Sequence, residues 1–218
     1  MKNLRILVVD DHQLMRKGVV AAIRDERPDW EVCGEASTGR EAVAAAERLK
    51  PDIVVMDISM PDLNGLEATR QIINQNSQTR VLILSMHESE QIVRDVLDCG
   101  ARGYILKSDA GTDLMGALDA LHNNKVFFSS NIAEVLLRGY LDGSAAGDKA
   151  TPSGLVSPRE REIIQLVAEG KSNKEVADTL NIGVKTVETH RAHIMAKLNL
   201  HSISDLVRYA IRNSIIEC

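Results

Sequence analysis

The first part of the chain alternates short apolar segments with longer amphipathic ones. Five segments have the length of β-strands and are rich in Val, Ile and Leu, at residues 5–9, 31–34, 52–56, 80–84 and 103–107. Helical periodicity follows each of them, near residues 13–25, 39–49, 65–75, 89–98 and 110–122. Nearly continuous apolar strands that alternate with helices are typical of a parallel sheet covered on both faces. The pattern predicts an α/β fold with a doubly wound five-stranded parallel sheet, and disfavours an antiparallel α+β fold, because no hairpin signal joins two of the segments.

The pattern changes after residue 125. Residues 126–141 predict one more helix, and residues 142–154 combine Gly, Ser, Ala and Pro with a few charges, which is typical of a flexible linker. Four short helical patterns follow, near residues 158–169, 173–180, 184–198 and 203–213. The sequence therefore predicts three parts: a first domain over 1–125, a linker over 126–156, and a second, smaller all-α domain of four helices over 157–218.

Three of the predicted helix starts have the spacing of a capping box. In this motif a Ser or Thr side chain and a Glu side chain three residues later bond each other's backbone N–H groups. The pairs are Thr38 with Glu41, Ser157 with Glu160, and Ser172 with Glu175.

The charge balance differs between the two predicted domains. The chain has 26 basic and 31 acidic residues, a formal net charge of −5, which excludes a basic coat over the whole protein. Residues 1–138 hold 16 basic against 21 acidic residues, whereas residues 157–218 hold 9 against 8 and three of the six His. A local basic face on the second domain therefore remains compatible with DNA binding.

The chain has no segment typical of a membrane protein. No apolar run approaches the roughly 20 residues that cross a bilayer, and the N-terminal segment carries charges where a signal peptide would be apolar. The sequence therefore predicts a soluble, cytoplasmic protein without a membrane partner.

Residues with chemical function follow four of the five predicted strands. Asp10 and Asp11 follow the first, Asp57 the third, Ser85 the fourth and Lys107 the fifth. In a wound parallel sheet, ligands bind at the carboxyl ends of the strands, so these side chains are expected to meet at one edge. Each alone has an ordinary interpretation, such as a helix cap or a solvated surface charge. Together they indicate a site, because three neighbouring acids repel one another unless a cation joins them.

The residue types indicate a metal-dependent phosphoryl transfer. No thiolate or imidazole ligands stand at metal-binding spacing, and Mg²⁺ suits a few carboxylates with water and a phosphoryl oxygen. A carboxylate can act as the nucleophile and form an aspartyl phosphate, and Asp57 on the central strand is the best candidate. Asp11 would hold the metal directly and Asp10 mainly through water. Lys107 would pair with one phosphoryl oxygen and the Ser85 hydroxyl would bond another.

The motifs VVDDH, MDISMPDLNG, ILSMHE and GYILK resemble those of the response-regulator receiver domains of bacterial two-component systems. They stand in the same order at the strand ends, and the resemblance covers about residues 4–122. It implies a flavodoxin-like fold with the strand order 2-1-3-4-5, Asp57 as the phosphoacceptor, and a histidine kinase as the phosphodonor. It also implies that Asp11, Asp57 and the backbone carbonyl of Ser59 hold Mg²⁺.

The same resemblance implies that Ser85 and Tyr104 form a switch pair. The hydroxyl would move toward the phosphoryl group, and the ring would swing inward behind it. The sequence departs from the family at Ser108, because receivers usually have a Pro after the Lys, joined by a cis bond. A cis bond before a residue other than Pro costs about 3–4 kcal/mol, so the geometry at this position stays open.

In the second domain, the segment 184–198 predicts a helix with two different faces. Val187, Ile194 and Leu198 share one face, while small and polar residues occupy the other, namely Lys185, Thr189, Ala192 and Ala196 flanked by Thr186, Glu188 and His193. Such a helix fits the major groove of DNA. Periodicity alone supports an ordinary helical bundle equally well.

The segment SPREREIIQLVAEGKSNKEVADTL and the later KTVETHRAHIMAKL resemble the LuxR-type DNA-binding domain over nearly all of 157–213. Joined to a receiver, this domain is typical of the NarL/FixJ class of transcriptional regulators. The resemblance implies groove contacts by Lys185, Glu188, Thr189 and Ala192. It places four further residues near phosphates, namely Lys174, Thr186, His190 and Arg191.

Two positions of the helix-turn-helix depart from the family. Gly183 stands where a Ser often caps the recognition helix, a loss of a few tenths of a kcal/mol. Glu188 stands where some members have Lys, so it is expected to accept from cytosine N4. The alternative is that Glu188 pairs with Lys185 or Arg191 and contacts no base.

The two domains together predict a phosphorylation-activated DNA-binding transcriptional regulator and not an enzyme. A histidine kinase or a small phosphodonor would modify Asp57 with Mg²⁺ as cofactor. A homodimer would then bind two half-sites of a pseudo-palindromic promoter, with RNA polymerase as a further partner.

Two rival functions are weaker. A phosphatase with an aspartate nucleophile would have an Asp-x-Asp element after the first strand, whereas Asp10 and Asp11 are adjacent and Asp57 is followed by Ile58. A constitutive DNA-binding protein with an inactive first domain is disfavoured, because no residue of the predicted site is missing.

Overall fold

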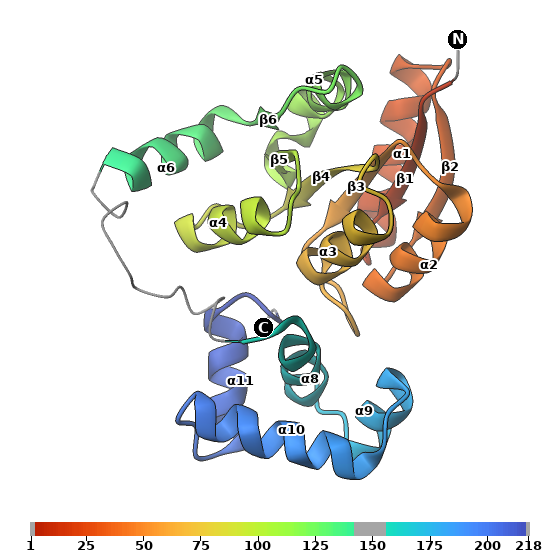
Figure 1. Ribbon diagram of the computed structural model, residues 1–218. Coiled ribbons are helices and arrows are strands. Elements are labelled where there is room, and N and C mark those ends of the chain that lie inside the picture. Colours follow the sequence, from red (N-terminus) through yellow and green to blue (C-terminus); the bar gives the residue numbers. More distant parts are fainter. Residues whose placement is uncertain (1–2, 142–155, 217–218) are drawn as a thin grey trace. The chain divides into compact units, whose positions relative to one another are not determined.

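Figure 1 shows the protein as a computed structural model, which describes residues 3–141 and 156–216. These residues form two compact units, one N-terminal and one C-terminal. The linker predicted over 142–154 lies outside the described residues, as does Cys218.

The N-terminal unit is a parallel sheet with helices on both faces (Figure 1). Its strands are β1 (Arg5–Val9), β2 (Glu31–Ala36), β3 (Ile53–Asp57), β4 (Arg80–Ser85), β5 (Gly103–Leu106) and β6 (Phe127–Phe128). Its helices are α1 (Gln13–Glu26), α2 (Gly39–Leu49), α3 (Gly65–Gln75), α4 (Glu90–Asp98), α5 (Ala110–His122) and α6 (Ser130–Leu141). A 3-10 turn, η1 (Lys107–Asp109), precedes α5.

The strands lie in the order β2-β1-β3-β4-β5-β6, and all neighbouring pairs are parallel. The predicted doubly wound α/β fold and the order 2-1-3-4-5 are therefore confirmed, but the predicted number of five strands is wrong. The sixth strand pairs with β5 through Phe127 and Phe128, so the helix predicted over 126–141 begins only at Ser130. A strand of two residues has too few positions to show the alternation by which strands are recognised.

The sheet is buried on both faces, because consecutive side chains of a strand point to opposite sides. One set of side chains packs against α1 and α5 in a core cluster that includes Ile6, Val55, Leu84, Ile23 and Leu118. The alternate positions, such as Val54 and Ile83, are fully buried as well. The strands therefore form a rigid frame, and their carboxyl ends lie at one edge.

The turn after β3 brings the backbone of Gly65 against that of Asp57. The N–H of Gly65 donates to the carbonyl of Ile58 over 2.8 Å, and a Cβ on Gly65 would lie 1.8 Å from the carbonyl oxygen of Asp57. The Asn64 side chain begins α3 by accepting a hydrogen bond from the N–H of Glu67 over 2.9 Å. Asp57 is thus held between a buried strand and a fixed helix start.

The C-terminal unit consists, within residues 156–216, of α8 (Pro158–Ala168), α9 (Asn173–Leu180), α10 (Val184–Lys197) and α11 (Ile203–Arg212). This confirms the predicted all-α domain of four helices. Their shared core includes Ile163, Val176, Val187, Ile194 and Leu206. A tight turn joins α9 to α10: Asn181 ends α9 in the left-handed region, at a φ of 52°, and Gly183 begins α10 without a side-chain cap.

Both capping boxes predicted in the C-terminal unit are present, in the pairs Ser157 with Glu160 and Ser172 with Glu175. The third pair differs from the prediction. Thr38 caps α2 by accepting from the N–H of Glu41, but the Glu41 carboxylate accepts the N–H of Ser37, one residue earlier than a capping box requires.

We predict that Gly65→Ala lowers the free energy of unfolding of the N-terminal unit by roughly 2–3 kcal/mol, because the new methyl group must displace the backbone of Asp57. Urea unfolding of the full chain, followed by the fluorescence of Trp30, measures this effect. Trp30 is the only Trp of the chain, and it packs against the core of this unit.

Gly18→Ala is the matched control on α1. Outside the helix's own backbone, no described atom lies within 4 Å of a Cβ at Gly18. Ala is more stable than Gly in a helix interior by roughly 0.5–1 kcal/mol, so this variant should unfold at a higher urea concentration. Equal urea midpoints for Gly65→Ala and the wild type would contradict the close approach.

Candidate functional site

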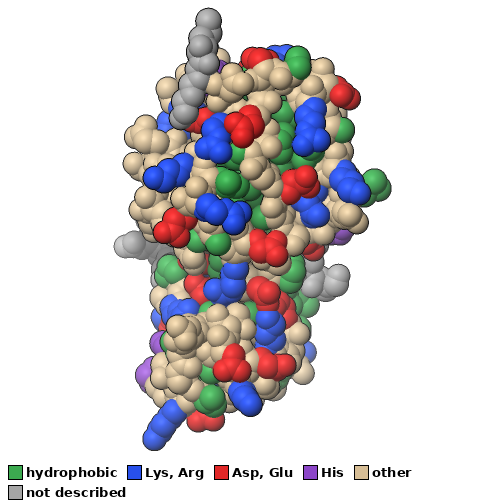
Figure 2. Space-filling model, turned by 90° about the vertical axis from the view of Figure 1, so that its right-hand side faces the viewer, with side chains coloured by type: hydrophobic (Ala, Val, Ile, Leu, Met, Phe, Trp, Pro, Cys, Tyr) green, Lys and Arg blue, Asp and Glu red, His purple; other side chains and the backbone are tan. Residues whose placement is uncertain are grey.

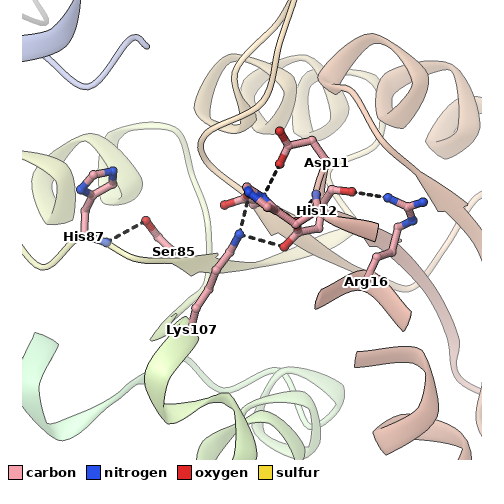
Figure 3. A network of polar contacts seen from close by, with 8 residues as sticks. Asp11, His12, Arg16, Ser85, His87 and Lys107 are labelled. Carbon is pink, nitrogen blue, oxygen red and sulfur yellow. Dashed lines mark hydrogen bonds and ion pairs between the residues drawn. The ribbon is translucent and has the colours of Figure 1, made fainter. Parts of the chain in front are cut away.

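The strand ends bring two buried acids and one ammonium group together. Asp10 follows β1 and Asp57 ends β3, and both residues are 2 % exposed. Lys107, directly after β5, places its Nζ 2.8 Å from Oδ2 of Asp57 and 2.9 Å from Oδ2 of Asp10 (Figure 3). The structure thus brings together residues from three strand ends, as the sequence predicts.

The acids at this edge can hold a metal ion. One ligand atom each of Asp10, Asp11, His12 and Asp57 lie within 4.8 Å of one another. Three carboxylates and the single ammonium of Lys107 leave a net charge of −2, which a divalent cation would balance. Because most of the donors are carboxylate oxygens, the set fits a hard cation such as Mg²⁺.

Burial raises the pKa of Asp57 from 3.8 to about 6, although the hydrogen bond and the charge of Lys107 lower it. The charges of Asp10 and Asp11 also contribute to this value by raising the pKa, but less than burial does. For Lys107, burial alone would lower the pKa, but its bonds to Asp57 and Asp10 raise it. Lys107 therefore stays charged, while Asp57 ionises close to neutral pH. A cation that joins the acids would favour its carboxylate form.

Ser85 and Tyr104, the predicted switch pair, contact the same loop residue, His87. Ser85 is 1 % exposed, and its hydroxyl oxygen accepts a hydrogen bond from the N–H of His87 over 3.2 Å (Figure 3). The hydroxyl of Tyr104 donates to the carbonyl of His87. Tyr104 is fully buried, which raises its pKa to about 12. The ring therefore stands in the inward position, and its movement on phosphorylation stays a prediction.

Two contacts of the acidic loop were missed by sequence reasoning. Nδ1 of His12 lies 2.8 Å from Oδ1 of Asp11, and Nη1 of Arg16 donates to the carbonyl of Asp10 over 2.6 Å (Figure 3). The contact of Arg16 leaves no signal in the residue types, because its acceptor is a backbone carbonyl.

Two further predictions concern the backbone at Ser59 and at Ser108. Ser59 is half-buried in the loop after β3, and its role as a carbonyl ligand stays a prediction. Ser108 lies in η1, and the described residues contain no cis peptide bond, so the bond from Lys107 to Ser108 is trans.

In the C-terminal unit, α10 has the two faces predicted from its periodicity. Val187 and Ile194 are buried, whereas the opposite face is exposed. The surface on that side has a hollow, lined by Lys185, Thr186, Thr189, His190 and His193. Each of these side chains can donate a hydrogen bond to a phosphate or a base edge, so the hollow fits a nucleic acid.

The predicted DNA-binding residues differ in how they are held. Lys174, Lys185 and Glu188 are exposed, and within the part of the chain that the structure describes their side chains have no hydrogen-bond or ion-pair partner. Arg191 is half-buried and donates to the Asn173 side chain at the start of α9, a contact that the sequence did not indicate. The pairing of Glu188 with Lys185 or Arg191 is therefore not seen.

Acidic and basic side chains are intermixed on the face that Figure 2 shows. Neither sign of charge forms a broad patch on this face. None of the helices described is both long and apolar enough to span a bilayer.

Comparisons with known families agree with both units. The model of the response regulator receiver domain matches residues 6–119, and that of the bacterial regulatory proteins of the luxR family matches residues 155–210. The receiver domain is the class of protein that the wound parallel sheet and its acidic edge define. The chain belongs to the response regulators of the NarL/FixJ class, which join a receiver to a LuxR-type DNA-binding domain.

Relatives of this family align along almost the whole chain. The transcriptional regulatory protein LiaR of Bacillus subtilis (strain 168) is 36 % identical over 213 residues, covering 98 % of this chain and 99 % of LiaR. The oxygen regulatory protein NreC of Staphylococcus carnosus (strain TM300) is 36 % identical over 217 residues, covering 98 % of this chain and 100 % of NreC. The predicted class of transcription regulator, as opposed to an enzyme class, is thereby confirmed.

A solved structure of RcsB from Salmonella enterica serovar Typhimurium is also similar. It shows RcsB bound to the promoter rprA in the presence of the phosphomimetic BeF₃⁻. The TM-score is 0.63 at 25 % identity, over 95 % of this chain and 98 % of that chain.

We predict that Asp57→Asn stabilises the metal-free protein at pH 7.5 by on the order of 3 kcal/mol, because the pKa of Asp57 is about 6 in the folded state against 3.8 in the reference. A raised pKa of an acid means that the folded state resists ionisation. The destabilisation of the wild type relative to Asp57→Asn is absent below about pH 3.8, grows up to about pH 6 and is constant above that pH. Urea unfolding in EDTA at several pH values, with Trp30 fluorescence as the signal, measures the difference.

Asp25→Asn is the control, because Asp25 is exposed at the end of α1 and its removal should not alter stability in this way. A difference between Asp57→Asn and the wild type that stays the same from pH 4 to pH 8 would contradict the raised pKa of Asp57.

Proposed function

We propose that this chain is a transcription factor that is switched by phosphorylation of Asp57. The observation that supports this most is the double contact of the Lys107 ammonium with the carboxylates of Asp57 and Asp10. It sets a nucleophile at the end of a buried strand, beside a group that can bind a phosphoryl oxygen and acids that can hold a cation.

The transfer we propose is an attack by a carboxylate oxygen of Asp57 on phosphorus. The donor would be the phosphohistidine of a histidine kinase or a small phosphodonor. The new O–P bond forms as the bond from phosphorus to the leaving group breaks. Since Oδ2 of Asp57 is engaged by Lys107, Oδ1 would be the attacking atom. The ammonium would then bind an equatorial phosphoryl oxygen.

Mg²⁺ is the cofactor of this proposal. Asp11, Asp57 and the backbone carbonyl of Ser59 would hold it directly, and Asp10 mainly through water. When bound, the ion stabilises negative charge on the transferring phosphoryl group.

The switch would work through Ser85 and Tyr104. The hydroxyl of Ser85 accepts the N–H of His87, and donating its hydrogen to a phosphoryl oxygen would draw it toward Asp57 and change that contact. Because Tyr104 bonds the carbonyl of the same His87, movement of this loop would change the support of the ring. The two side chains would in this way respond together to phosphorylation.

The output would be DNA binding by α10. Lys185, Glu188, Thr189 and Ala192 would meet base edges in the major groove, with Glu188 accepting from cytosine N4. Phosphate contacts would come from Lys174, Thr186, His190 and Arg191. The exposure of Lys185 and Glu188 and the known complex of RcsB with a promoter support this assignment.

The partners follow from these roles. Two copies of the chain would bind the half-sites of a pseudo-palindromic promoter, and RNA polymerase would be contacted there. The setting would be the cytoplasm, with a receiver over 1–125, a linker over 126–156 and the DNA-binding domain over 157–218.

We predict that acetyl phosphate with Mg²⁺ adds one phosphoryl group to the wild type and none to Asp57→Asn. Both carboxylate oxygens of the neighbouring Asp10 are engaged, by the N–H of His12 and by Lys107, whereas Lys107 engages only Oδ2 of Asp57. Mass spectrometry of the intact chain measures the label. Equal labelling of both proteins would exclude Asp57 as the acceptor. Continuous release of phosphate from a generic ester, without a stable label, would instead favour the phosphatase.

We predict that Glu188→Ala changes the relative affinities for DNA half-sites that differ at one base pair, by about 1–3 kcal/mol at that pair, because a carboxylate reads the cytosine amino group. Fluorescence anisotropy with a panel of duplexes at fixed salt measures this. Lys174→Ala is the control. It should weaken binding to all duplexes alike and reduce the number of ions released on binding by about one. An unchanged ranking of the duplexes by Glu188→Ala would show that Glu188 contacts no base.

A further inference from the structure

The acidic loop from Asp10 to His12 lies between two regular elements and is part of neither. The pairing of β1 ends at Val9, which stands opposite Ala36 on one side and Met56 on the other. Helix α1 begins after His12 without a hydrogen bond from a capping side chain. The loop is therefore held by individual hydrogen bonds and not by strand pairing or by a side-chain cap.

Within the loop, the backbone N–H and the side-chain Oδ1 of Asp10 each have a hydrogen-bond partner. Its N–H donates to the carbonyl of Ala36 over 3.2 Å, and its Oδ1 accepts the N–H of His12 over 2.8 Å. Its own carbonyl lies beyond the strand pairing and needs a donor, because a polar backbone group without a partner is costly in a buried place. That donor is Arg16, with Nη1 2.6 Å from the carbonyl oxygen (Figure 3).

Arg16 is itself fixed at a second point. Its Nε lies 3.2 Å from Oε2 of Glu35 on β2, and the side chain is only 16 % exposed. A guanidinium group is planar, so two bonds on different nitrogens define its orientation. Arg16 thus connects the edge strand β2 with the loop that carries Asp10 and Asp11.

The contact of Arg16 with the carbonyl of Asp10 affects the orientation of the carboxylates of Asp10 and Asp11. Asp10 and Asp11 repel each other when both are ionised, which favours an opened loop in the absence of a cation. The contact of Arg16 opposes such opening from the main-chain side, while His12 contacts the carboxylate of Asp11 over 2.8 Å. Contacts that orient metal ligands without touching the metal commonly change metal affinity by 10–100-fold.

We propose that Arg16 is a positioning residue of the cation site, which holds the backbone of the acidic loop so that Asp10 and Asp11 face the ion together with Asp57. The inference rests on the proposed function, because it concerns the Mg²⁺ that these acids would hold.

The test is a calorimetric titration of the full chain with Mg²⁺ alone, at a temperature where Trp30 fluorescence shows every variant to be folded. Arg16→Gln should weaken Mg²⁺ binding by about tenfold, the lower end for a residue that orients ligands. Arg24→Gln is the matched control: Arg24 lies on the same helix, is exposed, and has no partner among the described residues. It should stay within about twofold of the wild type, because exposed charges are screened by salt.

Arg16→Lys separates position from charge. Lysine keeps the positive charge and one donor, but it has no planar fork that can hold Glu35 and the loop carbonyl at once. We expect its Mg²⁺ affinity to lie between those of the wild type and Arg16→Gln. A wild-type affinity for Arg16→Lys would show that the two-point hold by the planar group is not needed, and would overturn the inference.

Two further outcomes are decisive. If Arg16→Gln unfolds at a lower temperature in EDTA but binds Mg²⁺ as the wild type does, Arg16 is only structural and the inference is wrong. If the wild type binds no Mg²⁺, or if the Asp57→Asn variant binds Mg²⁺ as tightly as the wild type, the proposed function fails, and this inference fails with it. The first result leaves the proposed function intact, so the two failures are distinguishable.

Discussion

The N-terminal unit is organised around an electrostatic imbalance, in which three carboxylates share a single ammonium group. Lys107 contacts the buried acids Asp57 and Asp10, and with the exposed Asp11 the three carboxylates leave a formal charge of −2 at this edge. Burial is the main cause of the raised pKa of Asp57, and the negative charges of Asp10 and Asp11 add to it. A cation that binds these acids would therefore lower the free energy of this edge of the sheet. A ligand shifts the equilibrium between two conformations only when it binds one of them more tightly than the other.

The sheet keeps this arrangement from relaxing. Asp57 ends a strand that is buried on both faces, so it cannot turn into solvent without breaking the strand. The approach of Gly65 to the carbonyl of Asp57 closes the other side. A parallel sheet is the architecture that places several strand ends at one edge, which explains why residues far apart in sequence meet there.

Much of this could be predicted from the sequence, because periodicity and strand ends report on local geometry. The wound sheet, the acids at its edge and the two faces of α10 are of this kind. The β6 strand could not be predicted, since pairing at Phe127 and Phe128 is decided by the neighbouring β5 and not by a local pattern. The contact of Arg16 with the carbonyl of Asp10 was missed because its acceptor is backbone, which leaves no trace in residue types.

The missed strand matters for how a signal leaves the receiver. In β5, Tyr104 pairs with Phe128, and its carbonyl accepts the N–H of Ser129 over 3.1 Å. The carbonyl of Ser129 in turn accepts the N–H of Ala133 over 2.9 Å, at the start of α6, which packs against α4. A shift of the backbone at Tyr104 would therefore reach α6 through hydrogen bonds of the sheet, without depending on helix packing alone. Because a two-residue edge strand is held by few bonds, it is also the part of the sheet that costs least to rearrange. Tyr104, for which a switch role is proposed, thus pairs directly with the shortest strand of the sheet.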